Sequence, residues 1–177
     1  MAKPRAGQPA GQNEVSAAAR QAVEPLVDTF RRTGGLPDGF WDDPYVFGYM
    51  GGTAAMAARL AAGGGLDDDT LGEVVLTVLH ESSARERDWL ASRAETLHGA
   101  GDESFAEGQR NAEKVMAVAM GGRQFDKDMD VRAARDLVRR MREMKLLQKD
   151  AEPRADVAAC LQTLLLFDRV RHGGDEA

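Results

Sequence analysis

The sequence predicts an all-α protein, folded as a single-domain bundle of about five to six helices with a flexible N-terminal tail. Apolar residues recur three and four positions apart along most of the chain, and no segment alternates as a strand would. Glycine runs and acidic residues separate these periodic segments at short intervals, as helix stops and caps do. Of the 177 residues, 43% are hydrophobic but only 6% are aromatic, so we expect a core of Ala, Leu, Val and Met.

Three helices are expected in the first hundred residues. The first covers 13–33, with Asn13 as its cap and Pro25 marking either a kink or a later start. The second begins at Pro44 and runs to residue 62. It is uncharged as far as Ala58, which favours a helix surrounded by protein over a membrane span. The third is expected to be continuous from 70 to 98, the alternative being a break near residues 82–83.

Three more helices are expected over 102–120, over 130–148 and from just after Glu152-Pro153 to just before Gly173. Together the six helices define a bundle domain over 13–172, flanked by disordered tails at 1–12 and 173–177. No apolar run follows the first basic residues, so no secretory signal is expected. The lone Cys160 cannot form an internal disulfide. We therefore expect a cytoplasmic protein without a membrane segment.

Charge is distributed unevenly along the chain. The net charge of −6 argues against a general nucleic-acid binder. Residues 36–80 carry seven acidic side chains and one basic one, whereas residues 123–149 carry nine basic and five acidic ones. The expected helix over 130–148 is therefore a basic element in an acidic protein.

No catalytic residue, metal site or cofactor is predicted. The aspartates at 126, 128 and 130 are spaced like the first ligands of a calcium loop, but Val131 and Leu137 occupy its glycine and glutamate positions. Capping of the helix that follows is the better interpretation. His80-Glu81 lacks the second histidine of a zinc-protease motif, and Cys160 lies on an apolar helix face.

The leading functional hypothesis is a non-enzymatic interaction or regulatory module that binds a protein partner or a second copy of itself. It rests on the opposed charged regions and on an exposed-looking aromatic connector. The residues assigned to partner binding are Phe40, Trp41, Arg132, Arg135, Arg139, Arg140 and Arg142.

Two alternatives remain open. In the first, the basic helix over 131–149 binds nucleic acid through its arginines, in which case affinity falls steeply with salt. In the second, His80, Glu81 and Arg85 face inward and form a polar pocket for a small ligand or for acid–base chemistry. Burial of these three residues decides the second alternative.

Overall fold

The computed structural model describes residues 11–147 and 152–172, and within them the chain is 76% helix with no strands. The prediction of an all-α fold is confirmed. Seven helices are present in these residues when the last, locally widened run is taken as one, against the five to six expected. The chain divides into two compact units, one made of residues 1–35 and 50–102 and the other of residues 36–49 and 103–177. The tails expected at 1–12 and 173–177 lie mostly outside the described residues.

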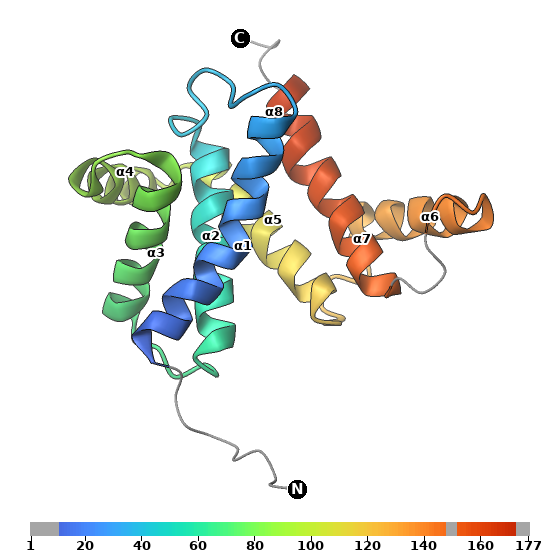
Figure 1. Ribbon diagram of the computed structural model, residues 1–177, viewed down its shortest axis with the longest axis horizontal. Coiled ribbons are helices and arrows are strands. Elements are labelled where there is room, and N and C mark those ends of the chain that lie inside the picture. Colours follow the sequence, from blue (N-terminus) through green and yellow to red (C-terminus); the bar gives the residue numbers. More distant parts are fainter. Residues whose placement is uncertain (1–10, 148–151, 173–177) are drawn as a thin grey trace, which may run out of the picture. The chain divides into compact units, whose positions relative to one another are not determined.

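Unit 1 contains α1 (Gln12–Arg32), most of α2 (Pro44–Ala61), α3 (Asp68–Ser83) and α4 (Arg87–Gly99). Helix α3 packs against both α1 and α4 (Figure 1). The buried side chains of α1 follow a helical stripe, as the sequence pattern predicts. They are Val15, Ala19, Val23, Leu26, Val27 and Phe30.

Helix α1 differs from expectation at its start. Its N-cap is Gly11, so Asn13 already lies inside the helix, and the Glu14 carboxylate accepts a hydrogen bond from the Gly11 amide at 3.2 Å. Pro25 neither ends nor starts the helix. It lies on the exposed side, and the Thr29 hydroxyl donates to its carbonyl at 2.7 Å.

The expectation of one continuous helix from 70 to 98 is wrong, because the helix ends at Ser83 and α4 begins at Arg87. Ala84 adopts a left-handed conformation with φ of 55° and donates its amide to the His80 carbonyl. The polar run around the break offers no apolar stripe that would hold a continuous helix against the core. The turn instead redirects the chain so that Leu90 and Leu97 become buried.

Unit 2 contains the first residues of α2, then α5 (Glu103–Ala119), α6 (Met129–Glu143) and α7 (Pro153–Gln162). A π-helical segment, η1 (Thr163–Asp168), continues α7 into the short α8 (Arg169–His172). Helix α7 packs against both α5 and α6 (Figure 1). Helix α6 is shorter than expected because Lys145 adopts a φ of 60° just after its end.

The start of α2 and helix α5 approach each other closely at two glycines. A Cβ atom at Gly108 would clash with the Tyr45 carbonyl and lie 2.8 Å from the Tyr49 amide nitrogen. A Cβ at Gly48 would likewise clash with the Phe105 backbone. The absence of these side chains lets the two backbones touch and buries the aromatic residues on either side.

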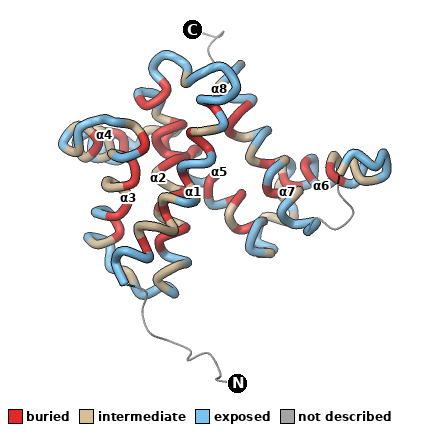
Figure 2. The backbone as a smooth tube through the Cα atoms, viewed as in Figure 1, coloured by how far each residue is buried: buried red, intermediate tan, exposed pale blue. Residues whose placement is uncertain are grey.

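The two aromatic side chains of the connector before α2 are buried, contrary to the expectation that they are exposed. Only 4% of Phe40 and 5% of Trp41 is exposed. Their rings meet edge to face at 5.2 Å, and a turn at Gly39 (φ 71°) brings the chain around them. Figure 2 colours the described residues by burial, with the buried positions of the helices in red.

No helix in the described ranges is both long and apolar enough to cross a membrane.

Candidate functional site

The polar stretch at the end of α3 does not form an inward-facing pocket. Glu81 is exposed and accepts hydrogen bonds from Arg20 at 2.7 and 2.5 Å. The half-buried His80 ring lies 2.6 Å from the Arg85 carbonyl, across the turn between α3 and α4. Arg85 is exposed and stacks over Trp89, 4.9 Å from the ring centroid. These contacts hold α1, α3 and α4 together, so the expectation of inward acid–base groups is wrong.

The basic helix α6 turns most of its arginines to solvent. Arg132, Arg135, Arg139 and Arg140 are exposed, whereas Arg142 is half-buried. Arg135 pairs with Asp126 at 2.5 Å, Arg139 with Asp136 at 3.0 Å and Arg142 with Asp156 of α7 at 2.5 Å. Arg132 and Arg140 have no ion pair or hydrogen bond within the part of the chain that the structure describes.

The start of α6 is fixed by the aspartate run, in the capping role that the sequence indicates. The Asp128 carboxylate accepts from the amides of Asp130 and Val131 at 3.0 and 3.2 Å. The Lys114 ammonium of α5 lies 2.9 Å from both Asp128 and Asp130. Among the described residues, no group of three or more His, Cys, Asp or Glu side chains is arranged to hold a metal ion.

The contacts between Lys114 and the two aspartates shift the pKa values of Lys114 and Asp128. Desolvation tends to lower the pKa of Lys114, but the hydrogen bonds to Asp128 and Asp130 outweigh it and raise that pKa. Burial acts to raise the pKa of Asp128, yet Lys114 and the capped amides bring it below its usual value. Lys114 and Asp128 therefore both stay charged at neutral pH, and their ion pair anchors the start of α6 to α5.

A groove of about 460 Å³ runs between α6 and the start of α7. Its apolar lining comes from Val138, Pro153 and Val157. Charged residues form its rim, and they are Arg135, Arg139, Arg142, Glu143 and Arg154. We call this feature the α6–α7 groove.

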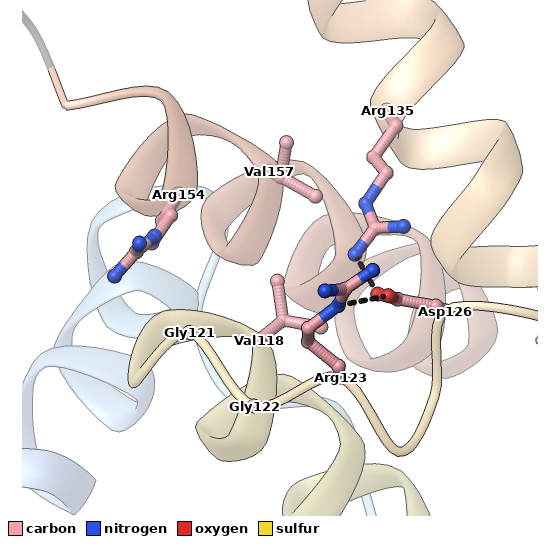
Figure 3. A pocket seen from close by; sticks show the side chains of 8 residues that line it. All are labelled: Val118, Gly121, Gly122, Arg123, Asp126, Arg135, Arg154 and Val157. Atoms are coloured by element: carbon pink, nitrogen blue, oxygen red, sulfur yellow. Dashed lines mark hydrogen bonds and ion pairs between the residues drawn. The ribbon is translucent and has the colours of Figure 1, made fainter.

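A smaller hollow of about 320 Å³ shares Arg135, Arg154 and Val157 with the groove. The loop after α5 contributes Gly121, Gly122, Arg123 and Asp126, and Val118 completes the lining (Figure 3). We call this second feature the arginine hollow. Arg123 and Arg135 both point at Asp126, whereas Arg154 lies apart from them beside Gly121 (Figure 3).

Methionine and leucine side chains near both ends of α6 are left in solvent. Met129 is 82% exposed and Met144 is 61% exposed. Met120 before α6 and Leu146 after it are also largely exposed. Flexible apolar side chains of this kind are common on surfaces that bind proteins.

Neither the sequence nor the structure matches a protein-family model, a curated protein or a solved structure. The site must therefore be interpreted from its own residues.

The predicted partner-binding residues thus fall into two sets. Phe40 and Trp41 are buried in the core, so their side chains are not exposed for contact with a partner. Of the arginines, Arg135, Arg139 and Arg142 come together on the α6–α7 groove, while Arg132 and Arg140 lie elsewhere on α6. Sequence reasoning missed Arg123 and Arg154, because a loop and a separate helix bring them to α6 only in the folded chain.

A third hollow of about 680 Å³ lies between the connector before α2, the start of α5 and α8. Two of its three charged residues, Asp43 and Arg169, already have structural partners. Asp43 accepts from the amides of Tyr45 and Val46 as the cap of α2, and Arg169 pairs with Glu107 at 2.8 Å.

Proposed function

We propose that this chain is a non-enzymatic interaction module whose α6–α7 groove binds an acidic, amphipathic helix of a partner protein. The observation that carries the proposal is the combination of an apolar groove lining with a rim of four arginines and one glutamate. A helix docks in such a groove by burying its apolar face, while its flanking charges select the partner.

The guanidinium groups of the rim favour a partner with carboxylate side chains, because each guanidinium has five N–H donors and can bind more than one carboxylate. Three rim arginines already neutralise aspartates of this chain, and these pairs hold the arginine stems along the groove. Arg154 has no ion pair with any described residue. The exposed methionines at both ends of α6 extend the apolar surface beyond the groove.

Nucleic-acid binding is supported by a different observation, namely the exposed Arg132 and Arg140, which lack ion pairs among the described residues. Phosphate contacts would draw on all exposed arginines of α6 regardless of the groove. The apolar lining of the groove has no role in that function, so protein binding is the better account.

Two variants of neighbouring arginines separate these functions. Arg139 lines the groove and Arg140 does not, yet both are exposed on α6 and both carry one positive charge. The probe is a fluorescently labelled helical peptide with leucine on one face and glutamate on the other, compared with a scrambled peptide of equal composition. We expect Arg139→Glu to weaken peptide binding about tenfold or more, and Arg140→Glu to weaken it less than about threefold.

Anisotropy titrations of both peptides and of a single-stranded DNA probe measure the effect. Equal loss of peptide binding in the two variants, or equal affinity for the scrambled peptide, would contradict a groove-specific site. If the protein binds DNA tightly and both variants abolish that binding, nucleic-acid binding is the better account of the function. Binding of a second copy of this chain is detected in the same samples by light scattering.

A further inference from the structure

The hollow of about 680 Å³ in unit 2 is built by three segments: the connector before α2, the first turn of α5 and α8. The connector turns because the Gly39 carbonyl accepts the amides of Asp42 and Asp43 at 2.8 and 3.0 Å. Asp38 and Asp43, on either side of this turn, both line the hollow. Its volume is within the range of small-molecule sites, about 300–1,000 Å³. We call it the connector hollow.

Three polar groups of the lining are not used by the described chain. The exposed Asp38 has no hydrogen bond or ion pair with any described residue. Asp43 caps α2 through Oδ1 alone, so its Oδ2 has no partner there either. The hydroxyl of the half-buried Ser104 likewise bonds to no described residue. Two carboxylates and one hydroxyl therefore remain able to accept hydrogen bonds.

Arg169, the cation of the lining, does not neutralise these carboxylates. Its guanidinium pairs with Glu107 at 2.8 Å and lies over the Tyr45 ring at 3.9 Å from the centroid. Glu107 is not part of the hollow, so the positive charge of Arg169 is balanced outside it. Asp38 and Asp43 are left as unpaired negative charges, which attract a cation.

The remaining lining indicates the class of that cation. It is apolar and comes from Pro37, Phe40, Pro44, Val46 and Val170. A calcium ion takes about six to eight oxygen ligands and gains nothing from apolar walls. An alkylammonium ion has three N–H donors for the two carboxylates and the hydroxyl, and its hydrocarbon chain is removed from water by the apolar residues.

We propose that the connector hollow binds a small organic amine in its ammonium form, with the nitrogen between Asp38 and Asp43 and the carbon chain against the apolar lining. The inference does not rest on the proposed function, because no residue of this hollow lines the α6–α7 groove. The end of a lysine side chain presents the same chemistry and is the second source to be tested.

The experiment titrates the full chain with n-butylammonium chloride and follows the backbone amides by NMR. The neutral control is n-butanol, which has a similar chain and no charge. We expect saturable shifts of the connector amides and about tenfold tighter binding of butylammonium than of butanol. Acetyl-Gly-Lys-Gly-amide distinguishes the sources: tighter binding of this peptide assigns the amine to a protein, and tighter binding of butylammonium assigns it to a free small molecule.

Two isosteric variants locate the site. Asp38→Asn removes the charge of an exposed, unpaired side chain and should weaken butylammonium binding about fivefold or more. Asp43→Asn should also weaken it, while the helix cap is kept because asparagine caps about as well as aspartate. Glu113→Gln is the matched control: Glu113 is exposed on α5, does not line the hollow and should change the affinity less than about twofold.

Three results would overturn the inference. Equal affinity for butanol and butylammonium would show that the charge is not recognised. Equal weakening by Asp38→Asn and Glu113→Gln would reduce the effect to general attraction by an acidic protein. Connector amides that do not shift in a saturable way would remove the site itself. Each of these results leaves the α6–α7 groove unaffected.

Discussion

Tyr45 shows how a single polar group holds together three separate segments of unit 2. Its hydroxyl donates to the Leu165 carbonyl at 2.6 Å and accepts from the Asn111 side-chain amide at 3.1 Å. The Arg169 guanidinium lies over the ring at 3.9 Å from the centroid. The start of α2, α5 and the widened last helix therefore meet at one phenol. Local sequence gave no indication of this, because the partners are 66 and 120 positions away.

Removal of this hydroxyl is expected to destabilise the protein. Tyr45→Phe leaves the buried Asn111 amide and the Leu165 carbonyl each without a partner, at a cost of about 1–3 kcal/mol in the free energy of unfolding. Urea denaturation measures the loss. Thr96→Val deletes an exposed hydroxyl that bonds only within α4 and should change stability by less than about 0.5 kcal/mol. Equal effects of the two substitutions would show that the Tyr45 contacts contribute nothing of their own.

At the scale of single residues, the capping role of the aspartates before α6 could be predicted, whereas the burial of the two connector aromatics could not. Capping acts within three residues of sequence, so the role of Asp128 follows from its position before the helix. Burial of Phe40 and Trp41 depends on segments distant in sequence, and a polar, glycine-containing connector gives no sign of it. The buried Lys114 was missed for the same reason.

Among the helices, the close crossing of α2 on α5 depends on glycine where the backbones touch. The sequence shows Gly48 in a pattern of small residues, which predicts close helix contact. The sequence does not reveal that Gly108 is the matching position on α5. A single glycine inside a helix predicts only that the helix is less stable than it would be with alanine there.

Two glycine-to-alanine substitutions should therefore have opposite signs. Gly108→Ala places a methyl group against the backbone of Tyr45 and Tyr49, which cannot move aside as a side chain can. We expect it to destabilise the fold by about 1–3 kcal/mol or more. Gly72→Ala lies in α3, where nothing approaches within 4 Å, and should stabilise by about 0.5–1 kcal/mol. Thermal and urea unfolding of both variants provide the comparison, and a stabilised Gly108→Ala would rule out the tight crossing.

The break between α3 and α4 was the less favoured of two sequence interpretations. Helical propensity continues through the polar run, so local rules alone do not stop the helix. The turn at Ala84 exists because it brings Leu90 and Leu97 into the core, and the His80 contact with the Arg85 carbonyl supports it. Tertiary burial overrides propensity here.

At the scale of the whole molecule, one acidic run and the basic helix belong to different units. The acidic run at residues 67–69 begins α3 of unit 1, whereas the basic α6 belongs to unit 2. Asp67 caps α3 by accepting from the Thr70 amide at 2.8 Å, so at least part of that acidity has a structural role. Most arginines of α6 remain in solvent, which is why the proposed binding site lies there.

Stability of the whole chain should fall at alkaline pH because of its buried phenols. Burial raises the pKa of Tyr45 to about 12, partly opposed by the Asn111 hydrogen bond and by Arg169, and raises the pKa of Tyr49 further still. An unfolded tyrosine titrates near about 10. Between these values the native state binds more protons than the unfolded state, so stability falls as the pH rises.

This prediction is tested by urea unfolding between pH 9 and pH 12 and by the absorbance of tyrosinate. The contribution of Tyr45 is fully present below about pH 10 and disappears as the pH approaches about 12. Tyr45→Phe should make the fall in the free energy of unfolding with pH shallower, because only the contribution of Tyr49 then remains. If the native phenols ionise near pH 10 with the chain still folded, the burial argument fails.

The sequence by itself determined the helical class, the capping role of the aspartates before α6 and the basic surface of α6. Each of these depends on residues a few positions apart, or on helical periodicity. Only the tertiary structure decided the break after Ser83, the burial of Phe40 and Trp41 and the pairing of both Arg123 and Arg135 with Asp126. These features join residues from separate segments, and their positions follow from packing and burial, which no local pattern in a chain encodes.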